Sequence, residues 1–207
     1  MAEATEIRVD PANAGQARAW DGDEGAYWAD NAERFDRAVA AYHGPFMAAC
    51  RIARGERVLD IGCGTGQTTR DVMLVWQGPG PNEWVRELGG ALAAGRNLPA
   101  PPPGAPGPFA LADPGRTRTL LASAGFSEVT LDALHEPMWF GCDPDDAHRF
   151  VLGLMGWMLD GLYSAARKRA LDALSATVSA HAGSDGITFA SGAWLIRSYC
   201  NYACSTP

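Results

Sequence analysis

Two strand-like runs between Arg57 and Gln77 stand too close together for an ordinary parallel crossover. The first covers 57–61 and leads into a glycine-rich loop, and the second, 72–76, begins only a few residues later. A parallel crossover needs about a dozen residues and usually contains a helix. The spacing therefore leaves two structures open. We favour a continuous helix over 67–76, and the alternative is a strand at 72–76 that pairs with something other than the first strand.

Length and composition predict one domain with added segments. The chain has 207 residues, enough for a single ordinary core. We expect a flexible segment over 1–25, one incomplete domain over 26–199 and a tail over 200–207. The net charge of −7 provides no uniform basic surface, so nucleic acid is not an expected partner.

The cysteines and the apolar pattern predict the cellular compartment of the protein. Five scattered cysteines without metal-ligand spacing indicate reduced thiols and no metal site. No leader-like segment and no apolar run of membrane-spanning length occurs in the sequence. These observations predict a cytoplasmic protein that does not act at a membrane.

Amphipathic patterns predict helices on both sides of the two runs. Asp113-Pro114 and Asp143-Pro144 are typical of helix starts, with Asp at the N-cap and Pro in the first turn. We place Leu120, Leu121 and Ala124 on the buried face of the helix that begins at Asp113. The expected helices cover 27–45, 46–52, 82–94, 113–125, 147–162 and 164–181; the expected strands cover 126–134 and 187–199, the latter interrupted at Gly192; and the expected linker covers 99–108.

The segment from Val58 to Gly66, VLDIGCGTG, carries the clearest functional signal. An apolar strand leads into glycines that permit close backbone approach. The helix N-terminus expected after the loop offers free N–H groups to an anionic ligand group. Asp60 at the end of the strand is suited to accept a hydrogen bond from a ligand amine. Dinucleotide-binding loops would require glycine where this chain has Gln67.

This loop resembles motif I of class I S-adenosylmethionine-dependent methyltransferases, which have a carboxylate two residues before the first glycine and the spacing G-x-G-x-G. The resemblance implies an α/β fold with a Rossmann-like sheet, S-adenosylmethionine as cofactor and a small-molecule methyl acceptor. It also implies which loop residues would hold the methionine end of the cofactor: Asp60, Gly62, Cys63, Gly64, Thr65 and Gly66.

The resemblance extends over most of 18–197. The N-terminal residues 19–36 are similar to a helical segment that lies across the cofactor pocket in a bacterial branch of these enzymes, which implies Trp20 and Trp28 as lid residues. Residues 74–77 resemble the fifth strand, 112–126 the helix that leads into the sixth strand, and 193–196 the last strand. The helices over 143–181 would then be a C-terminal insertion.

The sequence departs from the family between the loop and the fifth strand. Such enzymes place a helix and three further strand units there, and this chain lacks them. The missing block would supply the contacts to ribose and adenine, so the resemblance implies an internally truncated sheet. Losing three or four hydrogen bonds of about 0.5 to 1.5 kcal/mol each would weaken cofactor binding by roughly 10² to 10⁴. We therefore expect S-adenosylmethionine binding that is weak or lost, and we assign no catalytic base.

Other residues have a functional and a structural interpretation. His135-Glu136 would suit a base near an acceptor, or a solvated strand end, which we favour. Asp143, Asp145, Asp146 and His148 would suit a metal, but we favour ordinary helix-start chemistry. Trp28, Trp84 and Trp139 would suit an acceptor pocket or the core.

An alternative to the enzyme is a non-catalytic remnant or interaction protein. In this interpretation the helices from Asp143 to His181 bury their Leu/Met faces against a partner. A homodimer is the assembly that the alternative predicts, and it is compatible with the enzyme as well.

Overall fold

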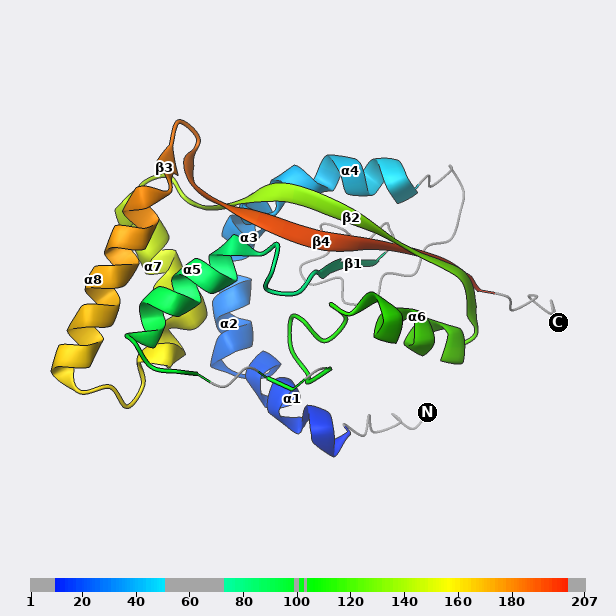
Figure 1. Ribbon diagram of the computed structural model, residues 1–207, viewed down its shortest axis with the longest axis horizontal. Helices are drawn as coiled ribbons and strands as arrows, with labels where there is room; N and C mark the ends of the chain where they lie inside the picture. Colours follow the sequence, from blue (N-terminus) through cyan, green and yellow to red (C-terminus); the bar gives the residue numbers. More distant parts are fainter. Residues whose placement is uncertain (1–9, 51–72, 99–100, 103, 201–207) are drawn as a thin grey trace, which may run out of the picture.

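A four-stranded sheet in which every neighbouring pair is antiparallel organises the structure, a computed structural model that describes residues 10–50, 73–98, 101–102 and 104–200. The strands are β1 (Met73–Trp76), β2 (Phe126–Gly141), β3 (Ala182–Gly183) and β4 (Gly186–Cys200). Their order is β1-β4-β2, and β3 pairs with β4 in a hairpin (Figure 1). The described chain is thus a mixed α/β fold.

The strand β1 decides between the two structures open for residues 72–76. Residues 73–76 form a strand, so the favoured continuous helix over 67–76 is wrong, and the strand alternative is right for these residues. The strand pairs antiparallel with β4, with Leu74 opposite Leu195. A partner from the distant C-terminal region removes the need for a crossover within a few residues. The first strand, expected at 57–61, lies outside the described residues.

The path between β1 and β2 includes helices. Both strands are antiparallel to β4, so they run parallel to each other. The connection contains α5 (Glu83–Ala93) and α6 (Pro114–Ser123), as a connection between parallel strands ordinarily does. Between β2 and β4 the chain forms α7 (Pro144–Met155), the 3-10 turn η2 (Gly156–Leu159) and α8 (Ser164–Ala180). These last elements and α5 group at one end of the sheet (Figure 1).

In the described residues before β1, the chain forms four short helices. After the 3-10 turn η1 (Pro11–Asn13) come α1 (Ala14–Trp20), α2 (Asp23–Asp30), α3 (Ala32–Ala38) and α4 (Ala40–Cys50). Two expectations for this region are wrong: residues 27–45 belong to three helices instead of one, and α4 continues through Pro45 instead of ending there. Tyr42 and Phe46 are both buried and one turn apart, and packing of this face outweighs the hydrogen bond that proline removes.

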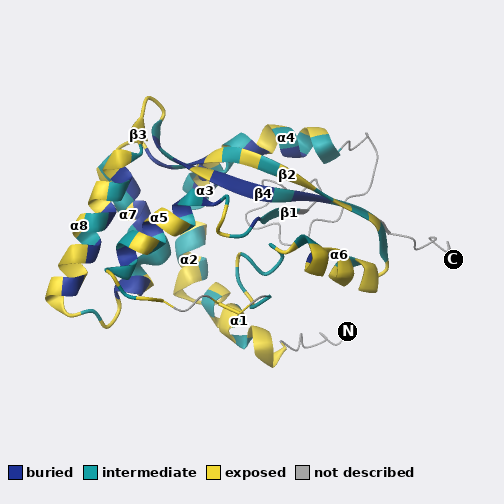
Figure 2. Ribbon diagram, in the orientation of Figure 1, coloured by how far each residue is buried: buried dark blue, intermediate teal, exposed yellow. Residues whose placement is uncertain are grey.

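The core lies where the sheet meets the helical group. Figure 2 shows buried residues along β4 and on the inner faces of α5, α7 and α8. One apolar cluster joins the three helices to β2 and β4, and includes Leu88, Phe140, Val151, Leu174 and Phe189. Each such side chain contributes about 1.5 to 3 kcal/mol by leaving water. The Leu and Met faces that the alternative function assigns to a partner are therefore packed within this chain.

The two Asp-Pro helix starts are confirmed. Asp113 accepts a hydrogen bond from the Arg116 N–H at 2.6 Å, and Asp143 accepts one from the Asp146 N–H at 2.8 Å. The expected buried face of α6 is wrong. Leu120 is 44% exposed and Ala124 is exposed, and among the α6 residues only Thr117 is buried.

Both long strands extend further than predicted. β2 continues to Gly141, so His135-Glu136 lies within the strand and not after it. β4 passes through Gly192 without interruption. A side chain at Gly192 would meet Pro81 at 2.8 Å and the His135 ring at 3.0 Å, so this glycine permits close packing instead of ending the strand. No described helix combines the length and apolar character needed to cross a bilayer.

Candidate functional site

The predicted cofactor loop falls within 51–72, outside the described residues. The loop residues concerned are Asp60, Gly62, Cys63, Gly64, Thr65 and Gly66. Of the predicted site, Trp20 and Trp28 are described. The described part of the candidate site consists of these two residues and the polar groups around the helices that carry them.

Trp20 and Trp28 begin a line of aromatic rings that enters the core. Their ring centroids are 5.6 Å apart, and Trp28 stacks on Phe35 at 3.5 Å with an interplanar angle of 11°. Phe35 in turn lies 5.2 Å from Phe150 of α7. The structure thus brings the two predicted lid residues together. Trp20, at 53% exposed, is the solvent end of the line, and Trp28 is partly buried.

The indole N–H of Trp28 is buried and has no hydrogen-bond partner among the described residues. Leaving such a donor unpaired costs about 1 to 3 kcal/mol. Buried polar groups without partners are rare in folded proteins and often occur at functional sites. This donor therefore sets Trp28 apart from a tryptophan that serves packing alone.

Tyr27 connects the N-terminal helices to α7. Its hydroxyl donates to the Phe150 carbonyl at 3.4 Å, and its ring lies directly over Gly153. A Cβ at Gly153 would come within 1.9 Å of the Tyr27 hydroxyl oxygen. Glycine at this position of α7 is what allows α2 to approach so closely.

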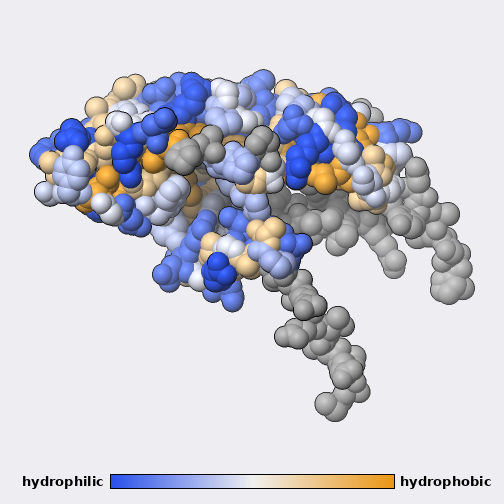
Figure 3. Space-filling model, turned by 60° about the horizontal axis from the view of Figure 1, so that its bottom comes forward, coloured by the Kyte–Doolittle hydropathy of each residue, from blue (hydrophilic) through white to orange (hydrophobic). Residues whose placement is uncertain are grey.

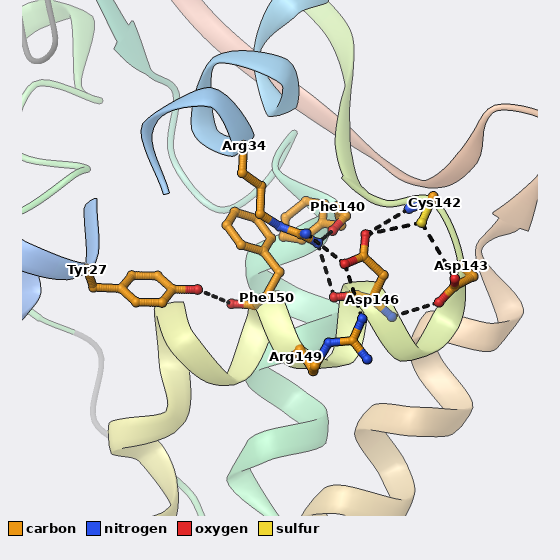
Figure 4. Close-up of polar contacts among 8 residues, drawn as sticks. All are labelled: Tyr27, Arg34, Phe140, Cys142, Asp143, Asp146, Arg149 and Phe150. Carbon is orange, nitrogen blue, oxygen red and sulfur yellow. Dashed lines mark hydrogen bonds and ion pairs between the residues drawn. The ribbon is translucent and has the colours of Figure 1, made fainter. Parts of the chain in front are cut away.

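Arg34 and Asp146 form the strongest polar contact between α3 and α7. The Arg34 Nη1 donates to Asp146 Oδ1 at 2.7 Å, and Nη2 donates to the Phe140 carbonyl at 2.7 Å (Figure 4). The guanidinium also lies over the Phe150 ring at 4.5 Å. The side chains are only 22% and 16% exposed, so water weakens the pair little. Arg34 thus joins α3 to the end of β2 and to the first turn of α7.

This contact changes the acidity of the neighbouring groups. Hydrogen bonding from Arg34 lowers the pKa of Asp146 to about 2, because it stabilises the carboxylate. The Cys142 thiol donates to Asp146 Oδ2 at 3.4 Å, and this bond, together with some desolvation and the nearby Asp143, raises the pKa of Cys142. Asp146 is therefore a weak base and Cys142 remains a neutral thiol. Neither is suited to acid–base or nucleophilic work at neutral pH.

An open hollow of about 730 Å³ lies over this contact. The exposed Arg37 guanidinium lies 4.0 Å from the centre of the Trp139 ring and forms one wall. The hollow offers a cation, an indole face and carboxylates to a small polar molecule with a planar part. Its lining residues are Ala29, Asp30, Asn31, Ala32, Glu33, Arg34, Arg37, Trp139, Cys142 and Asp146. Of the three tryptophans weighed for an acceptor pocket, only Trp139 lines it.

A second hollow, of about 430 Å³, contains His135 and Glu136. Glu83 also lines it, and its carboxylate binds the Ala190 N–H at 2.9 Å and approaches the His181 Nε2 at 3.7 Å. Glu83 thus binds the backbone of β4 and lies close to His181 at the end of α8. These contacts favour a structural interpretation of this cleft.

Asn82 is a polar residue whose role the sequence did not reveal. Its amide is fully buried and donates to the carbonyls of Gln77 at 2.9 Å and Gly192 at 3.0 Å. Its Oδ1 accepts from the Gly192 N–H at 3.1 Å and from the Trp84 Nε1 at 3.1 Å. Just beyond the end of β1, the Asn82 side chain makes hydrogen bonds to the backbone of β4 that a further strand residue would otherwise make. The pattern indicated only a helix start, because the partners on β4 are distant in sequence.

The acidic residues at the start of α7 cap this helix and bind Arg34. In the part of the chain that the structure describes, no group of three or more His, Cys, Asp or Glu side chains is arranged to hold a metal ion. Asp143 is used as the helix N-cap and Asp146 in the contact with Arg34. The helix-start interpretation is confirmed by the N-cap hydrogen bond of Asp143.

Comparison of the chain with protein-family models, with curated proteins and with solved structures finds no match.

Proposed function

We propose that this chain is a member of the S-adenosylmethionine-dependent methyltransferases that acts on a small molecule and binds its cofactor weakly. The observation that carries the proposal is the segment Val58 to Gly66, with its carboxylate and its G-x-G-x-G spacing. Asp60, Gly62, Gly64 and Gly66 would hold the methionine end of the cofactor. When bound, S-adenosylmethionine supplies a sulfonium-activated methyl group.

The pairing of the strands supports the proposal. The resemblance assigns β1, β2 and β4 to the fifth, sixth and last strands of one sheet. The structure joins these three segments in one sheet, with β4 in the middle. The proposal requires the first strand to join the same sheet.

The tryptophans provide the second line of support. Trp28 offers a buried N–H without a partner among the described residues, next to the exposed Trp20 ring. An unpaired donor beside an exposed indole suits a ligand with a planar ring and an acceptor atom. We infer that this pair covers the bound cofactor.

The hollow beneath α3 is our candidate for the methyl acceptor. Arg37 and Trp139 would bind a planar acceptor, and Arg34 would hold the wall in place. The low pKa of Asp146 and the raised pKa of Cys142 remove both as bases. Methyl transfer would therefore depend on alignment of the acceptor and exclusion of water, which are the main demands of this reaction on the protein.

Isothermal titration with S-adenosylmethionine tests the proposal. We expect saturable binding with one site, weaker than low micromolar because the contacts to ribose and adenine are absent. The change Asp60→Ala removes the carboxylate before the first glycine and should abolish the binding. The matched control Asp172→Ala removes an exposed carboxylate of α8, away from both hollows, and should leave it unchanged.

Two outcomes would contradict parts of the proposal. An absence of binding at millimolar cofactor would contradict the enzyme and favour the non-catalytic interpretation. Low-micromolar binding would contradict the expected weakness, and would show that other parts of the chain replace the missing contacts.

A further inference from the structure

The edge of the sheet formed by β2 has unused backbone hydrogen-bonding groups. Within the described residues β2 pairs only with β4 and is the last strand on its side (Figure 1). Residues of an antiparallel strand alternate in the direction of their N–H and C=O groups. The contacts of β4 therefore reveal which residues of β2 direct these groups away from the sheet.

Gly192 fixes this direction. Its N–H donates to Asn82 Oδ1 at 3.1 Å, and its carbonyl accepts from the Gln77 N–H at 2.9 Å, so both groups turn toward the β1 side. His135 lies opposite Gly192 in the register and must therefore turn its own groups to the free edge. The register is regular from Thr130 to Trp139, so Leu131 and Ala133 share this direction.

Pro137 supports the assignment independently. It lies opposite Ala190, whose N–H binds Glu83 on the β1 side, so the Pro137 nitrogen also faces the free edge. Proline is tolerated in a strand at a position where no ladder hydrogen bond is needed. The hydrogen bonds within the described chain provide no partner for the N–H groups of Leu131, Ala133 or His135.

The two ends of this edge are protected and its middle is not. Pro137 removes a donor at one end. At the other, the irregularity between Ser127 and Thr130, with Glu128 at a φ of 52°, interrupts the ladder. Between them Ala133, a small and exposed residue, lies at the centre of the stretch 131–135. This stretch has the length and exposure to accept another strand.

We propose that two copies of this chain associate through this edge, with β2 antiparallel to β2 of the second copy about a two-fold axis at Ala133. Charge does not oppose this self-pairing. Asp132 would lie opposite Leu134 of the second copy, His135 opposite Leu131, and Glu136 opposite Thr130, so no two like charges face each other directly. Asp132 is also neutralised by Arg197 of its own chain at 2.5 Å. An isologous interface of this kind is self-limiting at the dimer.

The short edge predicts a weak, concentration-dependent dimer. Three opposed pairs exchange hydrogen bonds, at residues 131 with 135, 133 with 133, and 135 with 131. This contact is smaller than the roughly 800 Å² per partner that a typical stable complex buries. The dimer does not depend on cofactor binding and would persist if the methyltransferase proposal failed.

Sedimentation velocity over a range of concentrations tests the dimer. The wild type should shift from monomer to dimer as its concentration rises. Ala133→Pro removes the central N–H at an edge position, as Pro137 already does, so it should fold normally by circular dichroism and remain monomeric. Ala133→Val keeps the N–H and should still dimerise. A wild type that is monomeric throughout, or an Ala133→Pro variant that dimerises equally, would overturn the proposal.

Disulfide trapping tests the register. The axis places Ala133 opposite its own copy at a Cα separation of about 5.5 Å, within the range of a disulfide. Ala133→Cys should therefore give a covalent dimer under mild oxidation. The control Asp132→Cys adds a thiol one residue away, where the copies are diagonal and further apart. Equal crosslinking of the two variants would refute the register, and so would no crosslinking of either.

Discussion

Two largely buried polar contacts each join segments that are distant in sequence, one through a neutral amide and the other through a charged pair. Asn82 joins the end of β1 to β4 through a neutral amide with backbone partners. Arg34 joins α3 to the first turn of α7 through a charged pair with Asp146. The first contact is indifferent to pH, whereas the second needs an ionised carboxylate. The N-terminal α1 packs against α2 and η1, and no contact of either kind is found for it among the described residues. In Figure 3 the part of the surface that projects downward, where α1 lies in Figure 1, carries mainly hydrophilic residues.

The largest effect is expected from breaking the neutral contact. Asn82→Ala leaves the Gly192 N–H, the Trp84 N–H and the Gln77 carbonyl without partners in the interior. Each such group costs about 1 to 3 kcal/mol, so we expect a loss of about 3 to 5 kcal/mol in the free energy of unfolding. Urea denaturation measures it. The control Asn31→Ala removes one hydrogen bond, from Nδ2 to the Tyr27 carbonyl, and should cost less than about 1 kcal/mol. Equal losses would refute the special role of Asn82.

A smaller effect that depends on pH is expected from the charged contact. Arg34→Met keeps apolar packing but removes the donors to Asp146 and Phe140, and should cost about 2 to 3 kcal/mol at neutral pH. The pKa of Asp146 is about 2 in the folded protein, below its ordinary 3.8. The stabilisation is thus complete above the ordinary value and is lost as the pH falls through the folded value.

Chemical denaturation of wild type and Arg34→Met at several pH values distinguishes the two contacts. The difference between these proteins should shrink as the pH falls below about 4. The difference between wild type and Asn82→Ala should change much less. A constant Arg34 effect down to the acid limit would mean that its carbonyl bonds and ring contact, not the carboxylate, provide the stabilisation.

The smallest effect on stability is expected at Trp20. Its ring is 53% exposed and contacts Trp28 in a tilted arrangement, so Trp20→Ala should cost less than about 1.5 kcal/mol. If Trp20 covers the cofactor, the variant should nevertheless weaken S-adenosylmethionine binding in the titration. Unchanged binding would remove Trp20 from the proposed site. Thermal denaturation checks the stability.

The helices could largely be predicted from sequence, because their signals are local. The Asp-Pro starts at Asp113 and Asp143 and the apolar periodicity of α8 depend on residues within a few turns. The wrong predictions concern positions whose secondary structure depends on residues distant in sequence. Residues 73–76 tolerate a helix, but β4 provides a strand partner more than a hundred residues away. Pro45 signals a break, but the buried faces of Tyr42 and Phe46 keep α4 continuous.

In the candidate site, too, some residues were predicted from sequence and others were identified only from long-range contacts. Trp20 and Trp28 were predicted as lid residues, and their contact with each other agrees with a shared position. Arg34 and Asp146 were not paired in advance, because no spacing links residues so far apart, and Asp146 was assigned to helix-start chemistry alone. Asn82 likewise showed only a helix start. Its contacts with Gly192 exist only once β1 and β4 are adjacent.

The sequence by itself determined the helix starts, the amphipathic helices around the sheet and the glycine-rich segment on which the proposed function depends, because these properties lie in neighbouring residues. The tertiary structure alone decided that residues 73–76 are a strand, that Arg34 meets Asp146, and that β2 has a free edge. These features result from long-range pairing, whose free energy comes from burial and hydrogen bonds between segments that no local pattern connects.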